Sequence, residues 1–169
     1  MSNIEKNTKL LIQAAERGDV VEVQRLIPLS DAKAHNSEAL LFAVYYGHIE
    51  CVKLLIPVSK PKDRNSSALQ LAARHGHTQC VELLIPVSNP KAHNSYALRE
   101  ALSNGHLICV ELLYPVSDPT VALKKLQQDY PNDYNAWGQL YEMIDAERLQ
   151  NTLILEVKNT TAVQAQRKM

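Results

Sequence analysis

Residues 65–93 read NSSALQLAARHGHTQCVELLIPVSNPKAH, and residues 36–64 before them read NSEALLFAVYYGHIECVKLLIPVSKPKDR. The two stretches are identical at 17 of 29 positions. The same spacing separates most glycines and prolines and all the cysteines, as well as three histidines: Gly18, Gly47, Gly76 and Gly105; Pro28, Pro57, Pro86 and Pro115; Cys51, Cys80 and Cys109; His48, His77 and His106. The chain is therefore built from tandem repeats, and a fixed period of this length is typical of a solenoid.

Each unit has the pattern of two short helices. In residues 65–93, apolar residues recur at helical spacing from 68 to 73, behind an Asn-Ser pair of the kind that caps helix N-termini. Gly76 ends this helix because glycine tolerates a left-handed backbone. A second apolar set occupies residues 80–85, and Pro86 ends it. Because neither helix is long enough to be stable alone, the units must stack and share apolar faces.

The two ends of the array differ from its middle. Glu22 and Arg25 stand where later units have a cysteine and a leucine, as expected of a polar end unit that no other unit precedes. After residue 119 the repeat stops, and we expect a helix from Thr120 to about Tyr130. A longer amphipathic helix should follow, running past Leu153 and carrying Trp137, Leu140, Tyr141 and Ile144.

The predicted organisation is a repeat domain, a helical cap and a tail. The repeat domain covers residues 1–119, with four units at about 7–35, 36–64, 65–93 and 94–119. Residues 120–158 form the C-terminal helical cap, and the polar residues 159–169 form a tail that we expect to be flexible.

Residues 47–55, which read GHIECVKLL, and residues 72–77, which read AARHGH, resemble the ankyrin repeat. Its consensus carries Ala-Ala, two variable residues, Gly-His, and then a helix of the Val-Val-x-Leu-Leu type. The resemblance covers residues 7–119 and implies an all-α helical solenoid of helix-turn-helix repeats whose function is to bind another protein. The family's Thr-Pro-Leu-His opening is replaced here by residues 67–70. The unit is also four residues shorter than the usual length of about 33, so the family's β-hairpin finger should be reduced to a tight turn.

The composition excludes several classes of function. The 169 residues carry 18 basic and 18 acidic side chains and no basic block, which argues against a nucleic-acid-binding or membrane-surface protein. No apolar run approaches the roughly 18 residues of a membrane span, and the N-terminus is not a signal peptide. Three cysteines do not suggest a disulfide framework. We expect a cytoplasmic protein that is monomeric when unbound.

The alternative to a binding module is an enzyme or metal-binding protein that uses the three His-x-x-Cys pairs or the C-terminal cap. Zinc requires four ligands, whereas each unit offers two, and packed helices lie roughly 8–10 Å apart. The cysteines fit the role of a small buried hydrophobe better. No nucleophile elbow, phosphate-binding loop or metal-binding helix motif occurs. The sequence therefore predicts no catalytic residue, metal or cofactor.

A third interpretation is a structural element that stacks end to end into filaments. The polar pair Glu22 and Arg25 at one end of the array and the bulky cap at the other argue against it.

Residues that vary inside a repeating frame indicate contact with solvent or with a partner. The pair before each glycine reads Glu-Arg, Tyr-Tyr, Arg-His and Ser-Asn in turn. In the ankyrin family this is a variable position on the concave binding face, and the resemblance implies the same use here. Tyr and Arg are also enriched in interface hot spots. We predict that the protein-binding residues are Tyr45, Tyr46, Arg74, His75, Tyr96 and Arg99. The simpler alternative is that the tyrosines only shield the neighbouring unit.

A second set of equivalent residues lies in the turns between units. Lys33, Lys62 and Lys91 occupy the same position of the repeat, and two residues later come His35, Arg64 and His93. In a stack these side chains would form a positive stripe suited to an acidic partner, although solvated turn residues are the simpler interpretation. The expected partner is one protein, and inhibition or neutralisation of that protein is one expected consequence of the binding.

Overall fold

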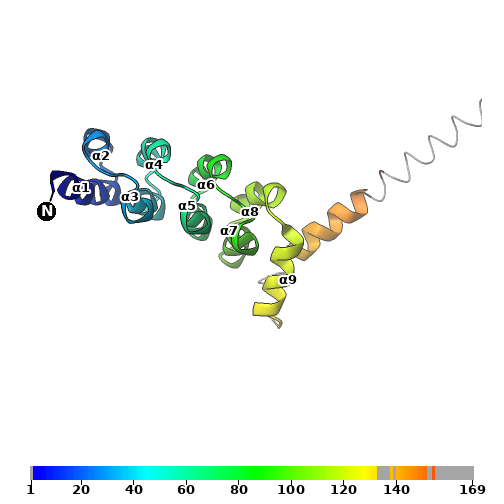
Figure 1. Ribbon diagram of the computed structural model, residues 1–169. Coiled ribbons are helices and arrows are strands. Elements are labelled where there is room, and N and C mark those ends of the chain that lie inside the picture. The colour runs from blue at the N-terminus through cyan, green and yellow to red at the C-terminus, as the bar shows by residue number, and fades with distance from the viewer. Residues whose placement is uncertain (1, 133–137, 139, 152–153, 155–169) are drawn as a thin grey trace, which may run out of the picture.

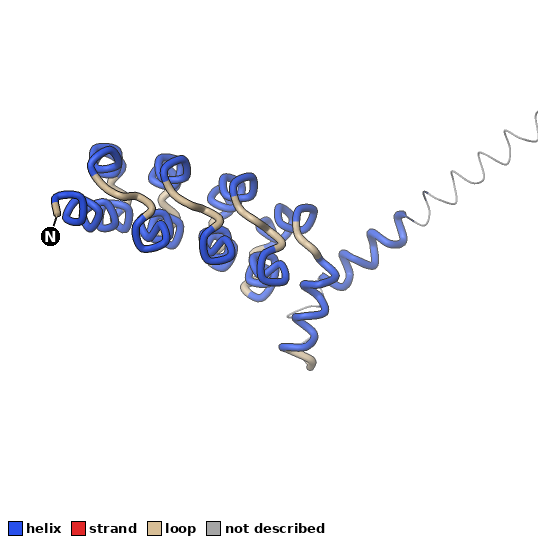
Figure 2. Tube along the Cα trace, in the orientation of Figure 1, coloured by secondary structure: helices blue, strands red, loops and turns tan. Residues whose placement is uncertain are grey.

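The computed structural model describes residues 2–132, 138, 140–151 and 154. Throughout this part of the chain the backbone forms helices and connecting turns, and none of it forms a strand (Figure 2). The helices stand in two rows that run along the molecule from the N-terminus (Figure 1). The predicted all-α solenoid is confirmed.

Each repeat contributes one helix to each row. The first row consists of α1 (Asn3–Arg17), α3 (Ala34–Tyr45), α5 (Asp63–Arg74) and α7 (Ala92–Ser103). The second row consists of α2 (Val20–Leu26), α4 (Ile49–Leu55), α6 (Thr78–Leu84) and α8 (Leu107–Leu113). Every second-row helix continues into a 3-10 turn with proline as its middle residue, at Ile27–Leu29, Ile56–Val58, Ile85–Val87 and Tyr114–Val116.

The connections between units are short. Residues 30–33, 59–62 and 88–91 lead from each 3-10 turn to the next first-row helix without forming a strand. The expected reduction of the ankyrin finger to a tight turn is therefore confirmed.

The predicted capping role of the Asn-Ser pair is wrong. The N-cap residues of α3, α5 and α7 are lysines, and no side chain caps these helices. The serines lie within the bounds of these helices but have a positive φ, and in α7 residues 93–95 are all left-handed, so its right-handed turns begin after Ser95. Each serine Oγ accepts a hydrogen bond from a backbone N–H 23 residues later: Ser37 from Lys60 at 2.9 Å, Ser66 from Asn89 at 2.9 Å and Ser95 from Asp118 at 2.8 Å. The hydroxyl thus ties the start of a unit to the turn that ends it.

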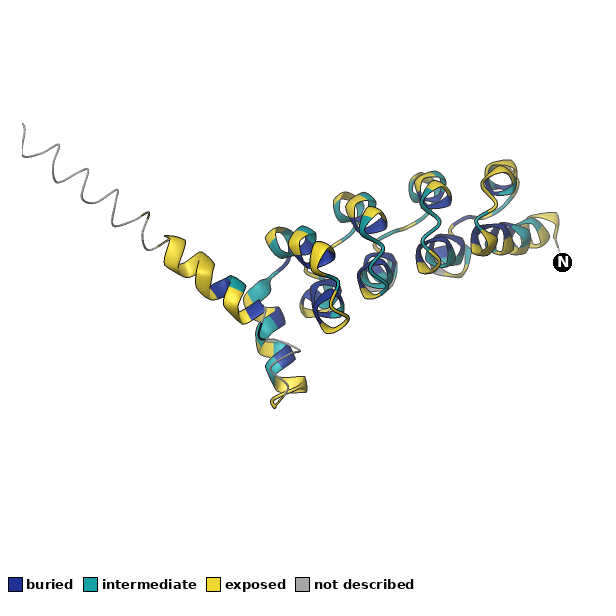
Figure 3. Cartoon of the chain, turned by 180° about the vertical axis from the view of Figure 1, so that it is seen from behind, coloured by how far each residue is buried: buried dark blue, intermediate teal, exposed yellow. Residues whose placement is uncertain are grey.

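The core repeats with the sequence. Two rows of leucines at the 29-residue period are buried at 1% exposure or less: Leu11, Leu40, Leu69 and Leu98 from the first row, and Leu26, Leu55, Leu84 and Leu113 from the second. Alanines at Ala14, Ala43, Ala72 and Ala101 are fully buried as well. In Figure 3 the buried residues lie on the sides of the helices that face neighbouring helices, as stacking requires.

The N-terminal end of the stack is polar, as predicted. Arg25 and Glu22 form an ion pair with each other at 2.6 Å, and both side chains remain partly exposed. The equivalent cysteines of the later units are fully buried.

The C-terminal end is covered by further helices. α9 (Pro119–Asp129) packs on α7 and so takes the place that the first helix of a fifth unit would occupy. Its axis is turned from that of α7 (Figure 1). Residues 140–151 are helical, and Leu140 and Ile144 are buried. The Tyr114 hydroxyl donates to Glu147 Oε2 at 2.6 Å, which ties this helix to the fourth unit. Trp137, Leu153 and residues 159–169 lie outside the described residues.

A histidine from each of the last three units packs on the glycine of the unit before it. The Nε2 atoms of His48, His77 and His106 lie 3.0 Å from the backbone carbonyls of Glu16, Tyr45 and Arg74, respectively, to which they donate. The same rings occupy the space beside the glycines. A Cβ on Gly76 would lie 2.6 Å from His106 Nδ1, and φ at Gly76 is +70°. Glycine is therefore required both by the backbone and by the close packing.

Gly105 allows the effect of the left-handed backbone to be measured apart from that of the histidine packing. Its φ is also +70°, but no atom of the described residues would lie within 4 Å of an added Cβ. We expect Gly105→Ala to lower the free energy of unfolding by roughly 1–2 kcal/mol, the cost of the left-handed backbone. Gly76→Ala should cost at least about 1 kcal/mol more, because the histidine must also move. Urea unfolding followed by circular dichroism measures both, and equal losses would contradict the role assigned to the histidine ring.

Candidate protein-binding site

The solvent-facing side of the first row carries two adjoining hollows. The α3–α5 hollow has a volume of about 160 Å³ and is lined by Glu38, Leu41, Phe42, Tyr45 and Leu71. The α5–α7 hollow has a volume of about 310 Å³ and is lined by Leu41, Ser67, Gln70, Leu71, Arg74, Tyr96 and Glu100. Because both contain Leu41 and Leu71, they form one groove across three helices. We call it the first-row groove.

The groove is built from the positions at which the units differ. In the repeat register these positions are 38, 67 and 96; 41, 70 and 99; 42, 71 and 100; and 45, 74 and 103. The residues between them on the same helices, such as Leu40 and Ala43, are buried and nearly constant. The helical period therefore turns one face of each first-row helix into the stack and leaves the variable face for the groove.

Five aromatic rings form a continuous row beside the groove, at the C-terminal ends of α3 and α5. Tyr46 stacks on His48 at 6.0 Å between ring centres and meets the edge of Tyr45 at 4.9 Å. Tyr45 contacts His75 at 4.6 Å, and His75 stacks on His77 at 6.0 Å. We call this set the aromatic row. Tyr45 and Tyr46 are 45% and 47% exposed, so about half of each side chain is accessible from solvent.

The charged residues of the groove are unequally available. Arg74 Nε lies 3.7 Å from Glu100 Oε2, and the Arg74 side chain is 60% exposed whereas that of Glu100 is 17% exposed. A hydrogen bond with Glu100 raises the pKa of Tyr96. Glu100 is thus engaged by two neighbours inside the groove, while the guanidinium of Arg74 is accessible from solvent.

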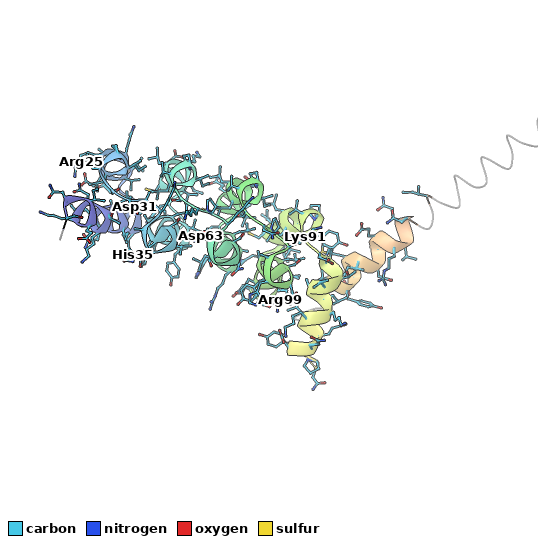
Figure 4. The ribbon with its side chains drawn as sticks, in the orientation of Figure 1. Arg25, Asp31, His35, Asp63, Lys91 and Arg99 are labelled. Carbon is cyan, nitrogen blue, oxygen red and sulfur yellow. The ribbon has the colours of Figure 1, made fainter. Side chains whose placement is uncertain are left out.

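Arg99 does not belong to the exposed face that the sequence suggested. It is only 7% exposed, and its Nη1 forms an ion pair with Asp129 Oδ2 of α9 at 3.2 Å. Its guanidinium carbon lies 4.9 Å from the ring centre of Tyr96. Figure 4 labels Arg99 on α7, the helix on which α9 packs. The physical reason is that α9 packs on α7 and supplies Asp129 as the ion-pair partner of Arg99.

The three lysines of the predicted positive stripe are accessible, but acidic residues lie near two of them in the chain. Lys33, Lys62 and Lys91 are exposed at the N-terminal ends of α3, α5 and α7. Asp31 comes two residues before Lys33 and Asp63 directly follows Lys62, and Figure 4 labels both aspartates and Lys91. The side chain of Arg64 lies outside the described part of the structure. The stripe is therefore a mixed charged edge with three exposed lysines.

Seven lining residues of the groove were not among the predicted binding residues: Glu38, Leu41, Phe42, Ser67, Gln70, Leu71 and Glu100. Three of the seven, Phe42, Leu71 and Glu100, occupy one position of the repeat, which holds Gln13 in the first unit. Two of them are apolar, so they resembled core residues. The change from Gln13 to Phe42, Leu71 and Glu100 was the signal that could have identified them.

The His-x-x-Cys pairs take part in packing. The cysteines are fully buried, and burial raises the pKa of each thiol, that of Cys80 to about 11. The histidine Nε2 atoms already donate to backbone carbonyls. Within the described residues, no cluster of three or more potential metal ligands occurs. These histidines and cysteines therefore have a packing role, and none of the three thiols is activated as a nucleophile.

Residues 58–122 match the family model described as ankyrin repeats (3 copies), and residues 35–66 match the model for a single ankyrin repeat. The chain belongs to the ankyrin repeat family. A comparison with curated proteins gave no match. Ankyrin repeats indicate a protein–protein interaction module, and the family is generally non-enzymatic. Among the described residues of this ankyrin protein, no helix is long and apolar enough to span a membrane.

Burial of the cysteines leads to a test of thiol reactivity. Because the thiolate is the reactive form and the pKa values are raised, we expect all three thiols to react slowly with Ellman's reagent at pH 8 in the native protein. All three should react at once in denaturant. One cysteine reacting natively at the rate of a free thiol would contradict this and would support the enzyme interpretation.

His75 leads to a test of pH dependence. Burial, followed by the nearby charges of His77 and Arg74, lowers the pKa of His75, whose Nε2 has no hydrogen-bond partner among the described residues. Because the unfolded chain then binds the proton more readily than the folded one, stability should fall as pH drops below about 6.5. We expect His75→Phe to make that fall shallower in urea titrations from pH 7 to pH 5. An identical fall in both proteins would contradict the assignment.

Proposed function

We propose that this ankyrin protein binds one partner protein through the first-row groove and the aromatic row, and that occupation of this face inhibits or neutralises the partner. The observation that carries the proposal is the pair of adjoining hollows, built entirely from positions that vary among otherwise similar units.

The frame beneath the face favours tight binding. The groove residues stand on helices whose ends are held by hydrogen bonds between units, such as His77 Nε2 to the Tyr45 carbonyl. A preorganised surface loses little conformational entropy when a partner binds. Half-exposed tyrosines can bury a large area on contact, and such residues commonly dominate interface energies.

The charge distribution favours a partner with an acidic surface. Lys33, Lys62 and Lys91 are exposed at one end of the first-row helices, and Arg74 is exposed within the groove. These groups would attract an acidic surface during encounter. We also propose that the unbound chain is monomeric, since the polar pair Glu22 and Arg25 closes the N-terminal end of the stack.

The test uses the partner that co-purifies with the full chain from its native cell. We expect the double variant Tyr45→Ala, Tyr46→Ala to weaken binding by at least about tenfold, because a hot-spot residue contributes about 2 kcal/mol or more. Helical content and the urea midpoint should stay close to wild type, because both side chains are half exposed.

The matched control is Leu107→Ala, Ile108→Ala on α8. These side chains are also exposed, at 52% and 61%, but they belong to the second row. Isothermal titration of each variant with the partner should show a loss only for the tyrosine variant. Unchanged affinity of the tyrosine variant, or an equal loss in the control, would sink the proposal.

A further inference from the structure

The first-row groove changes character along its length. The α3–α5 hollow is walled mainly by Leu41, Phe42 and Leu71, with the ring of Tyr45 at its edge. The α5–α7 hollow adds Ser67, Gln70, Arg74, Tyr96 and Glu100 to the two leucines that the hollows share. A bound segment therefore meets an apolar surface over α3 and α5, and a polar, charged surface over α5 and α7.

The size of the apolar hollow suits one side chain. Small-molecule sites occupy roughly 300–1,000 Å³, whereas the α3–α5 hollow has about 160 Å³. A single large apolar residue, such as leucine, methionine or phenylalanine, would contact Leu41, Phe42 and Leu71 there. Burial of such a side chain removes a large apolar area from water, which makes this hollow the anchor point of the groove.

The charges of the groove select an anion at its other end. A partner carboxylate reaching the α5–α7 hollow meets the exposed guanidinium of Arg74, which holds Glu100 only loosely at 3.7 Å. A partner cation would instead have to reach Glu100, which is largely buried and already engaged by Arg74 and Tyr96. Glu38 lines the apolar hollow and repels a carboxylate there, so the apolar side chain is assigned to the α3–α5 hollow and the carboxylate to the α5–α7 hollow.

We propose that the groove recognises a linear protein segment that carries a large apolar side chain followed or preceded, at a fixed spacing, by an aspartate or glutamate. The apolar side chain fills the α3–α5 hollow, and the carboxylate pairs with Arg74. Neighbouring packed helices lie roughly 8–10 Å apart, which an extended chain spans in about three residues. This inference rests on the proposed function and names the chemistry of the partner at the same site.

The repeat itself supplies the replacement residues for the test variants. Gln70 occupies the position of Leu41 in the next unit, and Glu16 occupies the position of Arg74 in the first unit. Leu41→Gln therefore removes the apolar wall, and Arg74→Glu reverses the charge, with residues that already stand at equivalent sites. Lys53→Glu makes the same change of charge on α4 of the second row, where Lys53 is half exposed, and is the matched control.

The experiment selects binders from a random library of 12-residue peptides displayed on phage, with the full chain as the target. We expect enrichment of peptides with one large apolar residue and one acidic residue about three positions apart. A synthetic consensus peptide should lose at least about tenfold in affinity with Arg74→Glu, because a charged hydrogen bond contributes roughly 1.5–3 kcal/mol. Leu41→Gln should also weaken it, and Lys53→Glu should leave it within about twofold.

A second selection, with the Arg74→Glu protein as the target, adds a second readout. The apolar residue should persist in the enriched peptides, and the acidic residue should be replaced by lysine or arginine. This exchange reports on the chemistry of the groove itself and does not depend on the stability of the variant relative to wild type.

The outcomes separate the two proposals. Peptides that need Tyr45, Tyr46 or Leu41 but carry no acidic residue at a fixed spacing, or carry a basic one, overturn this inference and leave the proposed function standing. Peptides whose affinity is unchanged by Leu41→Gln and by Tyr45→Ala, Tyr46→Ala bind elsewhere and count against the proposed function as well. The absence of any enriched sequence overturns recognition of a linear segment.

Discussion

The stack depends on one contact that every internal unit repeats, the histidine that fills the space beside the preceding unit's glycine. The last turn of a helix leaves carbonyl groups without partners inside the helix. At Tyr45 and Arg74, the histidine of the next unit donates to that carbonyl at 3.0 Å. Because the same ring occupies the place of a glycine Cβ, the contact fixes both the spacing of neighbouring units and the identity of the turn residue.

This contact also explains how the protein combines a constant frame with a variable surface. The histidine bonds to the backbone of Tyr45 and of Arg74, and it packs against a glycine, so it uses no side-chain atom of these residues. Their side chains are free to differ from unit to unit while their backbones are held in place. A binding residue on a backbone fixed in this way is well positioned, which is what a preorganised interface requires.

The period of the sequence was sufficient to predict the helices, the buried cysteines and the polar N-terminal end, because each of these follows from stacking equivalent units. It failed where a contact joins unlike parts of the chain. Arg99 shares a register position with Leu41 and Gln70, yet it is buried because α9 packs on its helix and supplies Asp129. The serines of the Asn-Ser pairs have the local pattern of helix caps, but a backbone N–H 23 residues away takes their hydroxyls. A pattern of neighbouring residues in the sequence cannot identify either of these distant partners, Asp129 for Arg99 or the backbone N–H for each serine.

The C-terminal end shows what replaces the histidine contact when the array stops. Gly105 keeps the left-handed backbone of its equivalents, although no atom of the described residues lies where the next histidine would be. Polar side-chain contacts with the cap take over instead, from Arg99 to Asp129 and from Tyr114 to Glu147. Because the first of these contacts lies on the variable side of α7, the cap also bounds the first-row groove. A segment bound as we propose would have the faces of α3, α5 and α7 available before it meets α9, and the succession of apolar and charged residues across those three helices would decide which segment fits.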